Sequence, residues 1–443
     1  MATLPPNYTG LSYESAQLAD PDFFSAANER LVAFVRGLGR QGVLRIGGNT
    51  SEFTVWSPEG FAPSGSTGGA VGPDTGGLKP RPKTPVTPKA IRNLASFLQA
   101  TGWQLIYGLN LGNGSPEQAA GEAKAVNDAA GDRVIAFQIG NEPDLYHRNG
   151  LRSPEWRFSD YYSEWKKYAQ AIRSAAPKAR LAGPDVANST DWIVSFAEQA
   201  KGEIVELTGH YYAEGPPTNP AMNIERLLHA NPKLLQNIPV IMNASRQSGH
   251  PFRMAEGNSC YNGGKPGVSD TFASALWGAD YMLQVGQAGY AGVNFHGGGN
   301  GYYTPIAGTR KSGFSARPLY YGMLVANQFA GATMLDSTLG DTSANVTAYA
   351  ARTDSELRVA IFNKDEGRAV RVVVISELHG ASARLWRLEA PGLETKAGVT
   401  LAGAAVSSNG SWSPAHEETV QGNGGRYEID LRPASAAVAF VSL

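Results

Sequence analysis

Two glutamates lie where apolar, strand-like segments end, and carboxyl groups in such positions can act as a pair. Glu142 follows the segment RVIAFQIGN, and Glu256 lies in the segment PFRMAEGN. Paired carboxyl groups suit glycoside hydrolysis, in which one protonates the leaving oxygen while the other attacks the sugar or activates water. Asn141, next to the first glutamate, adds an amide that could hold a sugar hydroxyl. The alternative is that either glutamate only forms an ion pair inside the fold.

Apolar segments rich in β-forming residues recur over much of the chain, and each ends in a small or polar residue. They are YTGLSYE, GVLRIGGN, WQLIYGLNLG, RVIAFQIGNE, ARLAGPDV, EIVELTGHYY, PFRMAEGN and AGVNFHGGG. The segments between them show helical spacing of apolar residues, as in ERLVAFVRGLG. Strands that are apolar almost throughout are typical of a parallel sheet buried on both faces. The pattern therefore predicts an α/β fold, a (β/α)₈ TIM barrel over residues 8–335.

The barrel would bring the two glutamates together. Active sites of such barrels lie at the carboxyl ends of the strands, and strands four and seven lie nearly opposite each other across the mouth. Glu142 follows the fourth predicted strand and Glu256 ends the seventh. Other acids at strand ends or in loops on this side are Glu14, Asp74 and Asp185. We favour Glu256 as the partner because its strand is otherwise apolar and it lies at the same strand–loop boundary as Glu142.

The rest of the chain predicts a second domain and a long loop. Short strands with turn signals follow one another from about residue 345, and Tyr427, Ile429 and Leu431 alternate with acids. We predict a β-sandwich over residues 336–443, with residues 1–7 packing on it. The low-complexity loop 62–89 lies between the second strand and the next helix, on the active-site side, and carries Lys79, Arg81, Lys83 and Lys89.

Composition excludes several functional classes. Lysine and arginine number 38 against 39 acids, so the net charge of −1 offers no long-range attraction to nucleic acid, acidic membranes or highly sulfated polymers. Cys260 is the sole cysteine, which excludes an internal disulfide and a cysteine-based zinc site. The sequence has no apolar run long enough to span a membrane. We expect a secreted or periplasmic protein whose leader is absent from this chain, with a cytoplasmic protein as the alternative.

Other motifs do not lead to a cofactor or a metal. GLGRQG matches a dinucleotide-binding pattern but follows a helix and precedes a strand, which is the reverse of the required order. His147, His210 and His296 each lie near a strand end, where a metal triad is conceivable. No ligand-spacing motif links them, so we interpret them as hydrogen-bonding groups around the site. The sequence therefore predicts neither a cofactor nor a metal.

Three motifs together carry a family resemblance. GNEPDLY, AEGNSCYNGG and HGGGNGYYTPI give the chain a resemblance to glycoside hydrolase family 79 over nearly its full length, nearer to a bacterial exo-acting β-glucuronidase of that family than to heparanase. The resemblance implies a retaining enzyme that removes terminal β-linked glucuronic acid, and possible tolerance of its 4-O-methyl form. It also implies that Glu142 is the acid/base and Glu256 the nucleophile, with Asn141 on the 2-hydroxyl and Tyr212 holding the nucleophile carboxylate.

The resemblance extends to the groups that would bind the sugar. It implies that Tyr261, the backbone of Gly263, and Tyr303 bind the C6 carboxylate, and that Glu14 and Asp74 accept hydrogen bonds from the 3- and 4-hydroxyls. A glycine-rich turn can present N–H groups to an anion, which supports the first set. For Asp74, a turn-forming role in GPDTGG is an equally good interpretation.

Two alternatives stay open from the sequence. A β-glucosidase or β-xylosidase of the same clan would use the same glutamates but would not need the carboxylate-binding residues. A non-catalytic carbohydrate-binding protein would not need the pair of glutamates at all. We expect a carbohydrate substrate, namely β-glucuronides, with no nucleic acid, no membrane and no obligatory protein partner.

Overall fold

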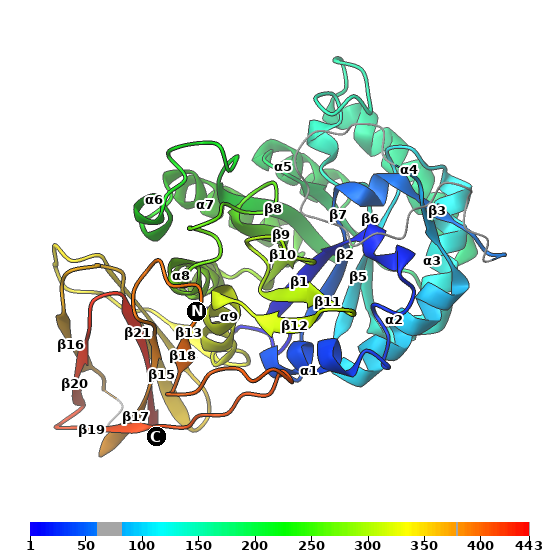
Figure 1. Ribbon diagram of the computed structural model, residues 1–443. Helices are drawn as coiled ribbons and strands as arrows, with labels where there is room; N and C mark the ends of the chain where they lie inside the picture. Colours follow the sequence, from blue (N-terminus) through cyan, green and yellow to red (C-terminus); the bar gives the residue numbers. More distant parts are fainter. Residues whose placement is uncertain (60–81, 378–379, 443) are drawn as a thin grey trace.

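A computed structural model describes residues 1–59, 82–377 and 380–442. Parallel strands form a closed barrel in the order β1-β10-β9-β8-β7-β6-β5-β2, which confirms the predicted (β/α)₈ fold (Figure 1). Their bounds are β1 Thr9–Glu14, β2 Val43–Gly47, β5 Gln104–Leu109, β6 Val134–Ile139, β7 Leu181–Val186, β8 Glu206–Glu214, β9 Phe252–Cys260 and β10 Gly292–Gly297. Every residue of β1, β2, β7 and β9 is buried, as expected for strands covered on both faces.

Helices surround the barrel and several begin with clear capping signals. Thr87, Ser115, Ser189 and Asn231 accept hydrogen bonds from backbone N–H groups at the starts of α2, α3, α5 and α7. The helices are α1 Glu29–Leu38, α2 Pro88–Thr101, α3 Pro116–Ala130, α4 Phe158–Ala175, α5 Thr190–Gln199, α6 Ile224–Leu228, α7 Pro232–Ser248, α8 Phe272–Ala288 and α9 Pro318–Asn327. In the described part of the chain, no helix is both long and apolar enough to cross a bilayer.

The C-terminal part consists of antiparallel sheets. The larger sheet has the order β13-β14-β15-β21-β17-β18, with β19 paired to β17, and β16 pairs with β20 in a separate sheet. The strands are β13 Thr333–Leu335, β14 Val346–Arg352, β15 Glu356–Asn363, β16 Val370–Ile375, β17 Ser382–Glu389, β18 Thr400–Leu401, β19 Glu418–Gln421, β20 Arg426–Leu431 and β21 Ser435–Ser442. Thr3 forms a bridge with Thr333, so the N-terminus lies against this region. The division between domains at residue 335 stays a prediction.

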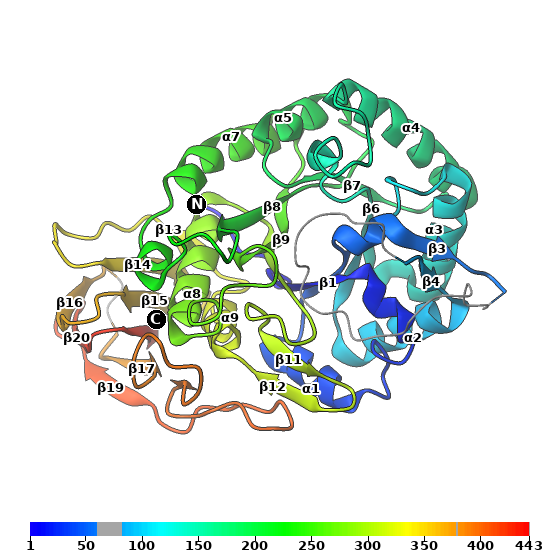
Figure 2. The same cartoon turned by 45° about the horizontal axis from the view of Figure 1, so that its top comes forward.

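Two small two-stranded sheets lie outside the closed barrel. The parallel pair β3 (Thr54–Trp56) and β4 (Thr84–Val86) brackets the segment 60–81, which lies outside the described residues. The hairpin β11 (Ile306–Thr309) and β12 (Gly313–Ala316) follows the last barrel strand. Figure 2 shows the two sheets at different edges of the barrel.

Helices α8 and α9 lie between the barrel and the C-terminal sheets. Almost every residue of both helices is buried, including residues on the sides that face away from the barrel. Asp280 of α8 receives hydrogen bonds from Thr347 and Tyr349 and pairs with Lys364 at 2.6 Å. The first turn of α8 also donates backbone hydrogen bonds to Leu393 and Thr395. The interface between the two parts therefore contains both apolar packing and a partly buried ion pair.

A buried glutamate in the barrel wall makes stability depend on pH. Glu122 on α3 accepts a hydrogen bond from the Tyr107 hydroxyl at 2.6 Å. Burial raises the pKa of Glu122 from 4.5 to about 7, and the bond from Tyr107 offsets only part of this. Folding therefore favours the protonated acid, and the free energy of unfolding falls as pH rises through this range.

We expect Glu122→Gln to increase the free energy of unfolding by about 2 to 3 kcal/mol more at pH 8 than at pH 5. The amide keeps an acceptor for Tyr107 but cannot ionise, so the cost of the buried charge disappears. Urea unfolding at both pH values measures the difference, and Glu198→Gln, at an exposed helix position, serves as the control. An equal gain at both pH values would contradict the prediction.

Candidate active site

A cavity of about 720 Å³ opens at the carboxyl ends of the barrel strands. Its lining includes eight of the residues that the sequence singled out on separate strands and loops: Glu14, Glu142, His210, Tyr212, Glu256, Tyr261, His296 and Tyr303. Among these, Glu142 follows β6 and Glu256 lies on β9, as predicted for the fourth and seventh barrel strands. The fold thus brings the two predicted carboxyl groups into one cavity.

The backbone turns both glutamates inward. Glu142 adopts φ 50° and ψ 50°, a left-handed conformation, and its N–H donates to the Asp185 carbonyl at 2.9 Å. The register between β8 and β9 shifts next to the pair His210 and Glu256, so that β9 holds one extra residue there. One carboxylate oxygen of each glutamate and one ring nitrogen of His210 lie within 4.8 Å of one another. The two carboxyl groups are therefore close enough to act on a single bond.

Cations and a phenol surround Glu256. Arg45 from β2 donates to Oε2, and the Tyr212 hydroxyl donates to Oε1 at 2.8 Å. His296 Nδ1 lies 3.5 Å from Oε2. Burial alone would raise the pKa of Glu256, but the positive charges of His296, His210 and Arg45 outweigh it and hold the pKa well below its usual range. Glu256 is therefore a carboxylate at neutral pH.

The environment of Glu142 has the opposite effect. Burial raises the pKa of Glu142, and the negative charge of Glu256 adds to the increase, while the hydrogen bond from His210 opposes it. His210 Nδ1 lies 3.0 Å from Glu142 Oε1. Two carboxyl groups whose pKa values move apart in one cavity can divide the roles of proton donor and anion between them. The directions of the two pKa shifts are those expected if Glu142 is the proton donor, a role that stays a prediction.

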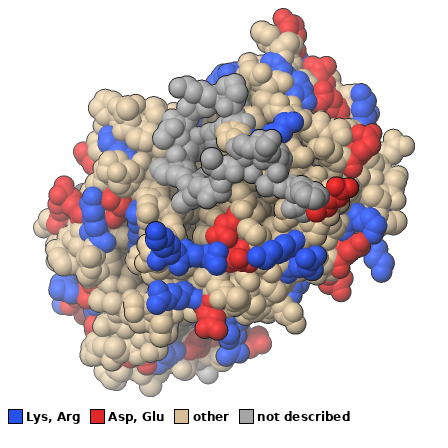
Figure 3. Space-filling view, turned by 45° about the vertical axis from the view of Figure 1, so that its right-hand side comes forward, with Lys and Arg blue, Asp and Glu red and all other residues tan. Residues whose placement is uncertain are grey.

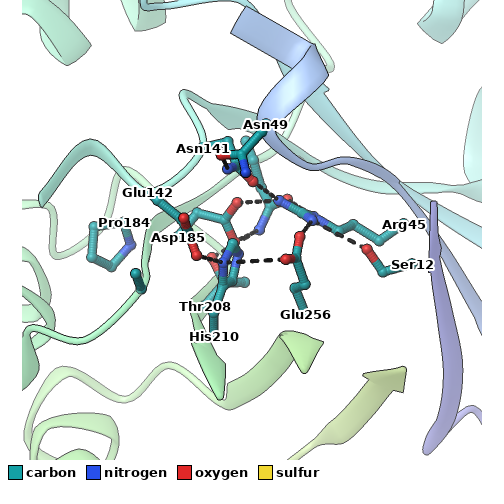
Figure 4. A network of polar contacts seen from close by, with 12 residues as sticks. Ser12, Arg45, Asn49, Asn141, Glu142, Pro184, Asp185, Thr208, His210 and Glu256 are labelled. Atoms are coloured by element: carbon teal, nitrogen blue, oxygen red, sulfur yellow. Dashed lines mark hydrogen bonds and ion pairs between the residues drawn. The ribbon is translucent and has the colours of Figure 1, made fainter. Parts of the chain in front are cut away.

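A polar network lies beneath the two glutamates (Figure 4). Arg45 is completely buried and also donates to Asp185 Oδ2 at 2.5 Å and to Asn141 Oδ1 at 2.8 Å. His210 Nε2 lies 3.1 Å from Asp185 Oδ1. Burial would lower the pKa of His210, but the charges of Asp185 and Glu256 raise it to about 10. The imidazole is therefore protonated, with Nδ1 hydrogen-bonded to Glu142 and Nε2 in an ion pair with Asp185.

The residues predicted to bind the C6 carboxylate lie along one side of the cavity. Tyr303 is buried, Tyr261 is 38% exposed, and their rings lie 6.3 and 6.2 Å from the ring of Tyr212. Gly263 adopts φ 87°, and its carbonyl accepts from the N–H of Tyr302 at 2.7 Å, which ties the two loops together. Tyr261 and Tyr303 line the cavity, whereas Gly263 lies next to a lining residue in the sequence. Their predicted role stays a prediction.

The remaining predicted sugar-binding residues divide into three cases. Glu14 lines the cavity, accepts from the Thr50 N–H at 2.8 Å and lies 3.5 Å from His296 Nε2. Asn141 turns its oxygen to Arg45 and donates to Asn49 at 3.3 Å. Asp74 lies outside the described residues, as do Lys79 and Arg81 of the same loop.

Sequence reasoning missed several residues that shape the site. Arg45 lies in the otherwise apolar VLRIG strand. A single arginine in a buried strand indicates a buried ion pair, and this signal could have been used. Glu52 is also buried and accepts from the N–H of Asn141 and the Tyr146 hydroxyl, which holds the loop after β6. Asp185 was one of the strand-end acids, but nothing in its segment indicated its partners. His210 and His296 contact the carboxylates as expected for hydrogen-bonding groups.

Glu142, His210 and Glu256 have the spacing of a possible metal site. A metal would need a neutral imidazole, but the carboxylates around His210 hold it protonated. Arg45 already occupies one oxygen of Glu256. These charges favour an acid–base pair over a metal site.

Charges on the molecular surface are mixed in sign. On the face drawn in Figure 3, Lys and Arg side chains lie between Asp and Glu side chains around the grey segment. Lys89, which lies in the first turn of α2, pairs with Asp22 at 2.8 Å, and Arg310 pairs with Asp20 at 2.8 Å. Acids thus neutralise these two cations, which is unfavourable for binding a polyanion.

Comparison with known proteins identifies relatives among glycoside hydrolases. Residues 348–438 match the family described as the glycosyl hydrolase family 79 C-terminal beta domain. A β-glucuronidase from Aspergillus niger is 27% identical over 385 residues, which is 79% of this chain and 68% of that enzyme. A heparanase from Mus musculus is 23% identical over 349 residues, which is 68% of this chain and 64% of that protein.

A solved structure extends the likeness to the whole fold. A 4-O-α-L-rhamnosyl-β-D-glucuronidase from Fusarium oxysporum aligns with a TM-score of 0.78 and 20% identity, over 99% of this chain and 97% of that chain. Together these findings confirm the predicted resemblance to glycoside hydrolase family 79, and the chain is identified as a glycoside hydrolase with a carbohydrate substrate. The roles of single residues and the stereochemistry stay predictions.

Proposed function

We propose that this glycoside hydrolase is a retaining, exo-acting β-glucuronidase that releases terminal β-linked glucuronic acid by double displacement. The observation that carries the proposal is the pair of carboxyl groups whose nearest oxygens lie within 4.8 Å and whose pKa values move in opposite directions. Retaining enzymes hold their carboxyl groups about 5 to 5.5 Å apart, whereas inverting enzymes need about 6.5 Å or more to admit a water. Tolerance of 4-O-methyl glucuronic acid is part of the proposal.

The chemistry follows from the charges of the two groups. Glu256 attacks the anomeric carbon while Glu142 donates its proton to the glycosidic oxygen, and the aglycone leaves. A covalent glycosyl-enzyme forms, and Glu142, now a carboxylate, takes a proton from the water that hydrolyses it. The hydrogen bond from Tyr212 to Glu256 keeps the nucleophile oriented before attack. His210 holds Oε1 of Glu142, so the transferable proton resides on the other oxygen.

Specificity for a uronic acid would come from the tyrosines beside the nucleophile. The hydroxyl groups of Tyr261 and Tyr303 can donate to a C6 carboxylate, together with the backbone N–H of Gly263. Glu14, held by Thr50 and His296, can accept from hydroxyls at the non-reducing end. A cavity closed by such contacts accepts a chain end and excludes internal sugars.

The test is the initial rate on p-nitrophenyl β-glucuronide beside the matching β-glucoside and β-xyloside, with NMR of the first-formed anomer. A strong preference for the glucuronide with a β-anomeric product supports the proposal. Preference for the glucoside would leave Glu142 and Glu256 as the pair but would refute the role of the tyrosines. An α-anomeric first product would refute retention.

We expect Tyr303→Phe to lower kcat/KM for the glucuronide by about 10- to 100-fold, because one hydrogen bond to a charged group is lost. The rate on the matching glucoside should change little, since that sugar has no carboxylate. Steady-state kinetics on both substrates measure the ratio. Tyr302→Phe is the matched control, because Tyr302 is the neighbouring residue and is 41% exposed. Equal losses on both substrates would mean that Tyr303 only packs against the site.

A further inference from the structure

We propose that Asp185 is a positioning residue that connects the two catalytic glutamates through Arg45 and His210. The proposal rests on the proposed function, because it assigns Asp185 a part in the same reaction. Asp185 is not among the residues that line the cavity. It acts through the groups that it holds.

The backbone places Asp185 out of the regular strand. It adopts φ 60°, a left-handed conformation that is unfavourable for a residue with a side chain. The register between β7 and β8 shifts between Pro184 and Val186, so Asp185 is the residue left out of the pairing. Its side chain is 1% exposed and faces the barrel axis among the polar groups drawn in Figure 4. A strained, buried acid persists only where its contacts compensate for the strain.

The contacts of Asp185 reach both halves of the site. Oδ2 accepts from Arg45 at 2.5 Å, and Oδ1 accepts from Gln138 and lies 3.1 Å from His210 Nε2. Its backbone carbonyl accepts from the N–H of Glu142 at 2.9 Å. Arg45 in turn donates to Glu256, and His210 Nδ1 faces Glu142. The carboxylate of Asp185 thus contacts the arginine that binds Glu256 and the imidazole that faces Glu142, while its backbone carbonyl holds the backbone of Glu142.

This arrangement sets the protonation of His210 as well as its orientation. Three carboxyl groups face the imidazole, namely Glu142 from the loop after β6, Asp185 from β7 and Glu256 from β9. Glu142 is neutral before it donates its proton and is a carboxylate afterwards. Glu256 loses its charge when the covalent intermediate forms. Asp185 is the carboxylate that keeps its charge throughout the cycle. It therefore keeps the imidazole charged while the charges of the other two change.

The test is Asp185→Asn, which keeps the size of the side chain and removes its charge. We expect kcat/KM to fall about 100-fold, since a small displacement of catalytic groups has an effect of this order. The loss should be larger for a poor leaving group, such as a sugar, than for dinitrophenol, because the poor one depends on the proton from Glu142. Asp144→Asn is the matched control: Asp144 is buried at the same end of the barrel but binds backbone N–H groups of residues 187–189.

A second measurement does not depend on turnover. NMR titration of the His210 ring should show an imidazolium throughout about pH 5 to 8 in the wild type and deprotonation within that range in Asp185→Asn. If the wild type cleaves no glucuronide, the proposed function fails, and the titration still tests the coupling. An unchanged His210 titration, together with an equal loss for all leaving groups, would overturn the role of Asp185.

Asp185→Glu covers the case in which Asp185→Asn does not fold. This variant keeps the charge and moves it by one methylene group. A folded Asp185→Glu protein with a reduced rate and altered leaving-group dependence supports a positioning role. Full activity in that variant would overturn it, because the exact placement of the carboxylate would then not matter.

Discussion

Glu256→Gln should lower kcat/KM for aryl β-glucuronides by about 10⁴-fold or more, because an amide cannot attack the anomeric carbon and no neighbouring group replaces it. The variant should still fold, since Arg45 retains its bond to Asp185 and the amide is nearly isosteric with the carboxyl group. Steady-state rates measure the loss. A 2-fluoro glucuronide, which stalls the second step, should label Glu256 in the wild type, and mass spectrometry of peptides locates the label.

Glu206→Gln is the matched control for this loss. Glu206 is another buried glutamate of the barrel paired with an arginine, Arg253, at 3.2 Å, but it begins β8 and so lies at the opposite end. Its replacement should leave kcat unchanged in the folded protein. A label on any residue other than Glu256, or comparable losses in both variants, would contradict the assignment of the nucleophile.

Glu142→Ala should lower the rate by about 10²- to 10⁴-fold on substrates whose aglycone needs protonation. It should spare the first step for dinitrophenyl glucuronide, because that aglycone leaves as a stable anion without an acid. The second step then becomes slow, since no base activates the water. Added azide should restore turnover and give the β-glucuronosyl azide, because the small anion fits the vacated space and attacks the intermediate from the side of the aglycone.

The products identify the roles. Measurement of rates with and without azide, with NMR of the azide product, distinguishes the two glutamates. If Glu256→Ala, rather than Glu142→Ala, were rescued with a β-configured azide product, Glu256 would be the acid/base and the roles would be reversed. The same experiment on Glu142→Gln removes proton transfer without vacating space, and therefore tests whether azide needs that space.

The fold and the meeting of Glu142 and Glu256 in one cavity could be predicted from the sequence because both depend on short segments. A parallel strand buried on both faces is an apolar run, and a polar residue that ends such a run lies at the mouth of the barrel. Glu142 and Glu256 each follow that pattern within a few residues. The sheet order of the C-terminal strands could not be predicted, because β15, β21 and β17 are neighbours in space but far apart in the chain.

The network beneath the pair was also beyond prediction. Arg45, Asp185 and His210 lie on three strands, and each contact depends on where a side chain turns once the barrel has closed. The left-handed conformation of Glu142 has no signature in residue type, and that of Asp185 has only a weak one, since aspartate tolerates this region but rarely adopts it. Family resemblance supplied candidate sugar-binding residues, but it did not indicate that the buried Asp185 contacts both Arg45 and His210.

The burial of α8 and α9 has a consequence for how such an enzyme can be rearranged. Two of the helices that close the barrel are apolar on nearly all sides, because the C-terminal sheets cover the surface that other barrels expose to water. A modular enzyme can exchange a carbohydrate-binding appendage and keep its catalytic unit intact. Here the two parts depend on each other, since a barrel separated from its sheets would expose an apolar surface to water and leave Asp280 without Tyr349 and Lys364.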